Sequence, residues 1–221
     1  MQRLLDIVLS GFALLVLSPL LLPVMLALRL SGEGEVFFVQ ERIGRGGAPF
    51  GLYKFATMLK ASPGIGTGTV TVKDDPRVLP LGRLLRKTKL NELPQLLNIF
   101  MGDMSVIGPR PQTRRCFDAF PVASQAQIVK VRPGLSGIGS IVFRDEEELM
   151  HASTEPERFY DEVIMPYKGS LEEWYVAHRG LRTYLASIFA TAWVVLFPKS
   201  SLVWSLFPGL PEPPQALAGV V

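Results

Sequence analysis

The first thirty residues carry the longest apolar run in the sequence. No charged residue occurs from Ile7 to Leu28, a stretch of 22 residues. At the helical rise of about 1.5 Å per residue, such a stretch is long enough to cross a bilayer hydrocarbon core about 30 Å thick. The pattern therefore predicts a membrane-embedded helix at residues 1–30.

Two prolines interrupt this run and open three interpretations of it. Pro19 follows Ser18 near the centre of the run, and Pro23 lies four residues later. Proline has no N–H to donate, and its ring clashes with the carbonyl four residues earlier, here that of Leu15. In lipid that carbonyl needs another donor, and the Ser18 hydroxyl is a local one. The alternatives are a cleaved signal peptide, a spanning helix and a re-entrant helix–break–helix that enters and leaves on one side.

The residues at the two ends of the run favour the re-entrant interpretation. Arg3 precedes the run and Arg29 follows it, so the distribution of basic residues gives no inside–outside asymmetry. A cleaved signal peptide is disfavoured because Asp6 offsets Arg3 and because Ala27-Leu28-Arg29 is a poor cleavage site. We therefore expect residues 1–30 to form a re-entrant membrane helix with both flanks in the cytosol.

The rest of the sequence alternates between short strand-like and helical patterns. Residues 36–55 contain two apolar runs around a Gly-rich turn and predict a β-hairpin. Residues 81–100 have leucines at helical spacing, and Pro94 divides that run into two helices or opens the second. Turn-rich loops are expected at 101–111 and 131–140, and further helices at 117–130, 145–150 and 155–182. The expected fold class is α+β and mostly α, with a small β-hairpin and amphipathic interfacial helices.

These patterns also divide the chain after the first helix. We expect one domain over residues 31–185. Residues 183–197 form an uncharged stretch of 15 residues, which is too short to span a membrane comfortably. Residues 186–207 therefore predict an apolar helix that packs or lies in the interface, with Trp193 and Trp204 as anchors at headgroup level. The tail at 208–221 is Pro-rich and is expected to be disordered.

Composition narrows the functional class. Of 221 residues, 48% are hydrophobic and the mean hydropathy is +0.27, which excludes intrinsic disorder and favours membrane association. One cysteine, Cys116, and two histidines exclude an internal disulfide and a Cys- or His-rich metal site. A net charge of +3 fits phosphate or an anionic membrane surface better than duplex DNA, so no nucleic-acid partner is expected.

The richest candidate chemistry lies in residues 83–111. Basic residues precede the pair Asn91-Glu92, and a further acid and a further arginine follow it: Arg83, Arg86, Lys87, Lys89, Asp103 and Arg110. Cations beside a helix start bind phosphate, and Mg²⁺ takes one or two carboxylates together with phosphate oxygens. The alternatives are that Asn91 caps a helix whose first turn contains Pro94, and that Arg110 is an exposed arginine in a turn.

A set of motifs extends from the first residues to the middle of the chain. In chain order they are Arg3-x-x-Asp6, Ser18-Pro19, Gln40-x-Arg42-x-Gly44, Phe50-x-x-x-Lys54-Phe55, Asp75-Pro76-Arg77, Gly82-Arg83 with Arg86, Leu93-Pro94-Gln95-Leu96 with Asn98, Gly102-Asp103-Met104-Ser105, Gly108 to Pro111, and Arg132-Pro133-Gly134 with Ser136-Gly137. By this set and order the chain resembles the bacterial sugar transferases, the small monotopic phosphoglycosyl transferases, over roughly residues 1–185.

The resemblance implies a specific reaction at the cytoplasmic face of the bacterial inner membrane. A sugar 1-phosphate would move from a UDP-sugar to polyprenol (undecaprenyl) phosphate, giving polyprenyl-diphosphate sugar and UMP. This would be the first membrane step of exopolysaccharide, O-antigen or lipopolysaccharide biosynthesis, with Mg²⁺ as cofactor and membrane lipids as partners. An interfacial homodimer is a candidate assembly. By resemblance the site residues are Asn91 and Glu92 for catalysis, Glu92 and Asp103 for the metal, and Gln40, Arg42, Lys54, Arg86, Arg110 and Arg132 for substrate and phosphate.

The chain departs from the family pattern at three places, of which position 91 matters most. The family has Asp-Glu before Leu-Pro-Gln-Leu, and that aspartate is the nucleophile; here the residue is Asn91. An uncharged amide is a very poor nucleophile and brings no charge to a metal. The other departures are Ala56 in place of arginine and Gly139-Ser140 in place of Ala-Gln. Two alternatives to an active transferase follow: an impaired homologue that binds the carrier or a partner, and a membrane-anchored module without sugar chemistry.

Overall fold

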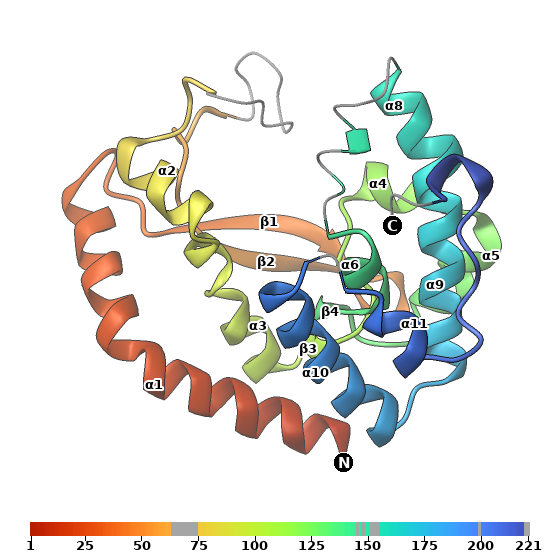
Figure 1. Ribbon diagram of the computed structural model, residues 1–221. Helices are drawn as coiled ribbons and strands as arrows, with labels where there is room; N and C mark the ends of the chain where they lie inside the picture. The colour runs from red at the N-terminus through yellow and green to blue at the C-terminus, as the bar shows by residue number, and fades with distance from the viewer. Residues whose placement is uncertain (63–74, 145, 147–148, 151–154, 199, 219–221) are drawn as a thin grey trace. The chain divides into compact units, whose positions relative to one another are not determined.

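The chain folds into two compact units. The computed structural model describes residues 1–62, 75–144, 146, 149–150, 155–198 and 200–218 (Figure 1). The larger unit comprises Met1–Asp6, Arg42–Phe50 and Gly102–Val221, and the smaller unit comprises Ile7–Glu41 and Gly51–Met101. The chain therefore passes between the two units four times, and each unit is described separately below.

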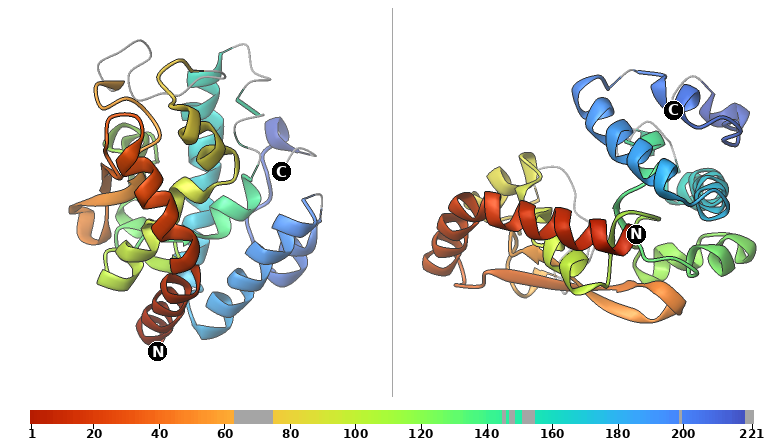
Figure 2. Two further views of the ribbon diagram at one scale, coloured as in Figure 1. Left: turned by 90° about the vertical axis from the view of Figure 1, so that its left-hand side faces the viewer. Right: turned by 90° about the horizontal axis from the view of Figure 1, so that it is seen from below.

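The N-terminal segment is one continuous helix, α1 (Gln2–Leu30), with Pro19 and Pro23 inside it. Among the described residues it alone is long and apolar enough to cross a membrane, judged by length and composition. Figures 1 and 2 show that its axis changes direction along its course, as expected of a helix that contains prolines. The expected break is thus a bend, because Ser18 Oγ donates to the carbonyl oxygen of Leu15 at 2.7 Å and replaces the donor that Pro19 lacks.

The smaller unit combines most of a β-hairpin with two short helices. The expected hairpin at 36–55 is confirmed as β1 (Phe37–Ile43) and β2 (Pro49–Phe55), whose tip belongs to the larger unit. The helical pattern at 81–100 gives α2 (Pro80–Lys87), a 3₁₀ turn (Leu90–Glu92) and α3 (Gln95–Met101), which starts directly after Pro94 as one of the two expected arrangements. One cluster of buried side chains in this unit comprises Leu28, Phe55 and Leu85.

The larger unit contains a parallel strand pair in the two segments expected to be loops. The strands β3 (Ser105–Ile107) and β4 (Gly134–Ser136) pair Ser105 with Gly134 and Ile107 with Ser136. Three-residue strands are too short to show an alternating pattern, so the sequence gives no signal for them. The short helices of this region are α4 (Arg114–Asp118), α5 (Val122–Ile128) and α6 (Ile138–Val142).

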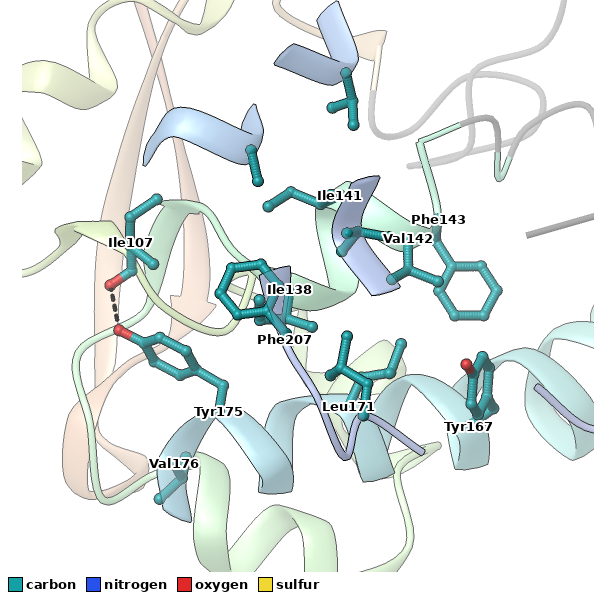
Figure 3. Close-up of a cluster of buried hydrophobic side chains, with 14 of the residues drawn as sticks. Ile107, Ile138, Ile141, Val142, Phe143, Tyr167, Leu171, Tyr175, Val176 and Phe207 are labelled. Atoms are coloured by element: carbon teal, nitrogen blue, oxygen red, sulfur yellow. Dashed lines mark hydrogen bonds between the residues drawn. The ribbon is translucent and has the colours of Figure 1, made fainter. Parts of the chain in front are cut away.

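The core of the larger unit forms where α6 packs on the long helix α9 (Met165–Ala177). Figure 3 shows Ile138 and Leu171 within this cluster, and Tyr175 Oη donating to the carbonyl oxygen of Ile107 at 3.0 Å. The other helical segments are α8 (Pro156–Phe159), a π-helical turn (Tyr160–Ile164), α10 (Leu181–Leu196), α11 (Leu202–Leu206) and a 3₁₀ turn (Gln215–Leu217). The expected helix at 145–150 falls partly on residues outside those described.

The C-terminal part of the chain contributes to this core. Leu210 and Leu217 are buried in the same cluster, in the segment for which the sequence predicts disorder. Tyr167 Oη donates to the carbonyl oxygen of Pro211 at 2.9 Å. The described part of the tail therefore packs along α9.

Candidate functional site

The turn that carries Asn91 and Glu92 is entered through an uncommon backbone conformation. Lys89 has φ 58°, the one positive φ at a non-glycine residue in the described part of the chain. The helix α2 ends at Lys87, and the left-handed Lys89 leads the chain into the 3₁₀ turn. Such conformations cost energy for residues other than glycine and cluster at functional sites. The conformation of Lys89 thus marks the turn between α2 and α3 as a candidate functional segment.

Asn91 is buried inside this turn. Its exposed fraction is 8%, and its Oδ1 has no hydrogen-bond partner among the described residues. An unsatisfied buried acceptor is costly, so it needs a reason. The helix-capping interpretation does not supply one, because Asn91 lies within a 3₁₀ turn whose N-cap is Lys89. The next residue, Glu92, is half-buried.

Close packing of backbone fixes the helix that carries Arg86. A Cβ at Gly82 would collide with the backbone of Thr57, so only glycine allows α2 to lie this close to that segment. Arg86 follows one turn later and its Nη1 lies 3.7 Å from Met58 Sδ. The other substrate-binding residues expected in the smaller unit, Gln40 and Lys54, lie on β1 and β2 and are half-buried.

The position of α3 against the hairpin depends on Asn98, a residue to which the sequence assigned no structural role. Its side chain is fully buried, its Oδ1 accepts from the amide of Tyr53 at 2.9 Å, and its Nδ2 donates to the carbonyl of Gly51 at 2.7 Å. One amide side chain thus provides the hydrogen-bond partners of two backbone groups of β2. This contact ties the segment after Asn91 to the strand that carries Lys54.

In the smaller unit one motif forms a buried ion pair. Arg77 Nη2 lies 2.6 Å from Asp75 Oδ2, and both side chains are almost fully buried. Arg77 Nη1 also donates to the carbonyl of Ser62 at 2.8 Å. These contacts stabilise the chain just before α2, so we regard Asp75-Pro76-Arg77 as structural.

The remaining candidates lie in the larger unit around the segment 102–111. Arg110 is exposed, whereas its neighbours Pro109 and Pro111 are buried. Two other expected phosphate ligands brace this segment: Arg42 Nη1 donates to the carbonyl of Pro111 at 3.1 Å, and Arg132 Nε donates to that of Gly102 at 2.7 Å. Asp103 is exposed on the same segment. The structure therefore places Arg42, Arg110, Arg132 and Asp103 in one unit and Gln40, Lys54, Arg86, Asn91 and Glu92 in the other.

The start of α1 is anchored beside this segment by a buried carboxylate, which the sequence did not single out for this role. Asp6 Oδ1 accepts from Ser105 Oγ at 2.9 Å, from the amide of Val106 at 2.9 Å and from Tyr184 Oη at 2.8 Å. Gln2 Nε2 donates to Ser105 Oγ at 3.1 Å. Because Asp6 is only 1% exposed, these donors compensate its burial. The first turns of α1 are thereby fixed to β3.

Comparisons with known proteins match nearly the whole chain. Residues 1–198 match the family described as bacterial sugar transferase. The exopolysaccharide production protein ExoY of Sinorhizobium fredii is 37% identical over 159 residues, which cover 66% of this chain and 70% of that protein. The UDP-glucose:undecaprenyl-phosphate glucose-1-phosphate transferase of Escherichia coli is 38% identical over 143 residues, 64% of this chain and 31% of that protein.

The name of a third relative specifies a different nucleotide sugar. The UDP-N-acetylgalactosamine-undecaprenyl-phosphate N-acetylgalactosaminephosphotransferase of Aeromonas hydrophila is 37% identical over 143 residues. The match covers 64% of this chain and 34% of that protein. This chain therefore spans about a third of the length of these two transferases and most of the length of the ExoY protein.

Proposed function

The chain belongs to the bacterial sugar transferase family, and from that premise we propose that it transfers a sugar 1-phosphate from a UDP-sugar to undecaprenyl phosphate. In this reaction a new phosphoanhydride bond forms to the carrier phosphate, the diphosphate bond of the UDP-sugar breaks, and UMP leaves. The match over residues 1–198 carries the proposal. Two relatives support it further, because their names specify this reaction with two different UDP-sugars.

The alternative of an impaired homologue receives no support from the comparisons. The relatives are named as transferases or as a protein of exopolysaccharide production. Asn91 therefore calls for a different route rather than for loss of activity. Either another carboxylate, such as Glu92, is the nucleophile, or the carrier phosphate attacks the UDP-sugar directly. The buried Oδ1 of Asn91 then serves as an acceptor for a group that arrives with substrate.

Arginines supply the proposed phosphate contacts. The guanidinium group forms strong paired hydrogen bonds to phosphate, and prolines on both sides limit the conformations of Arg110. Arg86 is held in place by the packing of α2. Gln40, Arg42, Lys54 and Arg132 are proposed as additional substrate contacts; of these, Arg42 and Arg132 also brace the backbone of 102–111.

The oxygen donors at positions 91 and 92 fit a hard cation. An amide oxygen without a partner lies next to a carboxylate, and Mg²⁺ binds proteins through few such oxygens while substrate phosphates and water complete its shell. No group of three or more His, Cys, Asp or Glu residues is present in the described part of the chain. We propose that Glu92, beside the amide oxygen of Asn91, holds Mg²⁺, which would neutralise phosphate charge when bound.

We propose that the protein sits on the cytoplasmic face of the inner membrane with α1 as a re-entrant helix. Support comes from the bend in α1 and from its exposed apolar side chains, such as Phe12 at 65% and Leu15 at 72%. In the larger unit, α10 also exposes apolar residues one turn apart, namely Leu181, Leu185 and Phe189. Exposed apolar faces of this kind are typical of interfacial helices. We also propose that the protein forms a homodimer at the membrane surface, which cross-linking in nanodiscs tests.

A transfer assay tests the proposed reaction. The purified chain in nanodiscs is incubated with undecaprenyl phosphate, Mg²⁺ and, in separate reactions, UDP-glucose, UDP-galactose, UDP-N-acetylglucosamine and UDP-N-acetylgalactosamine. We expect carrier-dependent UMP release with at least one of them. Arg86→Ala should lose this activity, whereas Lys87→Ala, one position on in α2 and exposed, should keep it. Repeated turnover to UMP that does not depend on the carrier, or no UMP release with any of the four sugars, would contradict the proposal.

A further inference from the structure

A buried carboxylate in α9 lacks the contacts that normally accompany a buried charge. Glu172 is 1% exposed, and neither of its carboxylate oxygens has a hydrogen-bond partner among the described residues. The cation that interacts with it is Lys168, one turn earlier, whose Nζ is already 2.6 Å from Glu146 Oε2. Burying a carboxylate without a dedicated partner is costly, and such a residue needs a reason.

The carboxylate of Glu172 faces the backbone of two segments that lie far from it in sequence. A Cβ at Gly139 would collide with Glu172 Oε1, so glycine is required where α6 passes this side chain. The backbone amides of Gly139 and Arg110 lower the pKa of Glu172, although neither amide forms a hydrogen bond to its carboxylate. Figure 3 shows the sequence neighbours Ile138 and Leu171 in one core cluster, which holds α6 against α9 at this point.

The second of these segments is the one that carries Arg110. Gly108, Gly134 and Gly137 pack so closely that a Cβ at any of them would collide with backbone of the neighbouring segment. This backbone packing leaves few ways for the segment to shift, and its Arg110 amide lowers the pKa of the buried Glu172. Arg110 therefore has an exposed side chain and a backbone anchored in the core.

We propose that Glu172 is a positioning residue for Arg110: its ionised carboxylate attracts the amides of Arg110 and Gly139 and holds the Gly108–Pro111 segment in the conformation that binds phosphate. The proposal rests on the proposed function insofar as Arg110 contacts substrate. Misplacement of a phosphate ligand by about 1 Å lowers turnover by about a hundredfold.

The ionisation of Glu172 gives the proposal a pH signature. Burial raises the pKa of Glu172 to about 7, and Lys168 and the two amides lower it by less. Two titratable groups of α9 itself interact with it, Lys168 and Tyr175. From α6 and from the Gly108–Pro111 segment, the backbone amides of Gly139 and Arg110 contribute. The carboxylate is thus mostly protonated at pH 5.5 and mostly ionised at pH 8.

A raised pKa also means that the ionised carboxylate destabilises the folded chain. An acid whose pKa rises from 4.5 to about 7 on folding lowers the free energy of unfolding as pH increases between these values. Replacing Glu172 with the neutral isostere glutamine removes this cost at pH 8. A residue that only supported the fold would give the opposite result, because its substitution would lower stability and activity together.

The experiment compares Glu172→Gln with Glu173→Gln, a matched control one residue away. Glu173 accepts from Ser124 Oγ at 2.5 Å, toward α5, and a glutamine can keep that hydrogen bond. For each protein in nanodiscs we measure hydrogen exchange of residues 106–112 and 136–141, the melting temperature, and kcat and KM for transfer, at pH 5.5 and 8.

For Glu172→Gln at pH 8 we expect exchange at least fivefold faster in both segments, an equal or higher melting temperature, and a kcat about tenfold to a hundredfold lower. At pH 5.5 the variant and the wild type should differ little, and Glu173→Gln should match the wild type throughout. Unchanged exchange at pH 8, or a lower melting temperature together with lower kcat, would overturn the proposal. A wild type without transfer activity would contradict the proposed function. Hydrogen exchange does not require turnover, so it would still test whether Glu172 holds the Gly108–Pro111 segment.

Discussion

Ser18 Oγ lies 2.7 Å from the carbonyl oxygen of Leu15, the carbonyl whose helical donor is missing because residue 19 is proline. The hydroxyl thus satisfies the Leu15 carbonyl within α1, which matters most in lipid. A bend lets both ends of an apolar helix lie at the same membrane surface.

The first prediction concerns the topology of α1. In a Cys116→Ser background, single cysteines at Gln2 and Glu33 should both react with a membrane-impermeant maleimide only from the cytosolic side. Pro19→Ala should restore the helical donor, straighten the helix and favour a full crossing, so that position 2 becomes labelled from outside. Labelling of position 2 from outside in the unchanged helix would make α1 a spanning helix. Ala27→Ser, which lies away from Ser18-Pro19, is the control and should leave the labelling unchanged.

The second prediction concerns position 91. The wild-type chain should form no covalent phosphosugar adduct on Asn91, because an amide is a very poor nucleophile. Asn91→Asp should raise Mg²⁺-dependent transfer and yield an adduct of one sugar phosphate, detected by intact-protein mass spectrometry after incubation with the UDP-sugar. Glu92→Gln should abolish any activity.

Two results would revise that assignment. An adduct on the wild-type chain would identify another carboxylate, such as Glu92 or Asp103, as the nucleophile. Efficient transfer that Asn91→Asp does not raise, without any adduct, would indicate direct attack by the carrier phosphate.

The third prediction concerns phosphate binding by Arg110. Arg110→Ala should weaken binding of a nucleotide sugar by about 1.5–3 kcal/mol, the contribution of a hydrogen bond to a charged group. Isothermal titration calorimetry with the UDP-sugar that supports transfer measures this change. Arg114→Ala is the matched control, since Arg114 is also exposed and forms an ion pair with Asp118 at 3.1 Å, within α4. Equal affinity of Arg110→Ala and the wild type would remove Arg110 from the site.

The fourth prediction concerns the anchor of α1. Asp6→Ala should lower the free energy of unfolding by about 3 kcal/mol, because it leaves buried donors of Ser105 and Tyr184 without an acceptor. Tyr184→Phe removes only one of the three donors and should cost about half as much. Thermal unfolding in detergent, followed by circular dichroism, provides the comparison. A smaller effect for Asp6→Ala than for Tyr184→Phe would show that Asp6 is not the centre of this network.

Local sequence signals predicted the elements that depend on local physics. The hairpin at 36–55 and the division of 81–100 at Pro94 follow from strand patterns, glycine turns and proline chemistry. The hydroxyl of Ser18 was likewise identifiable as a donor for Leu15, because both lie within one helical turn. What the sequence overstated was the effect of the prolines, since α1 continues through both, with Ser18 supplying a donor for the Leu15 carbonyl.

The elements missed by the sequence depend on partners distant in the chain. The strands β3 and β4 are three residues each and are defined only by one another. The anchoring role of Asp6 needs Tyr184, and the environment of Glu172 needs Gly139 and Arg110. The buried, unpartnered state of Asn91 also arises from tertiary packing, whereas its departure from the family pattern was visible in the sequence.

The hydrogen bond between Asp6 and Tyr184 spans 178 residues, nearly the whole chain, and this separation has a consequence for synthesis. At translation rates of about 5–20 residues per second, Tyr184 is made roughly 10 to 35 seconds after Asp6. During that interval the apolar helix is complete while its anchor, Asp6, still lacks the Tyr184 donor. If α1 inserts as proposed, it therefore meets the membrane before the hydrogen bond to Tyr184 can form.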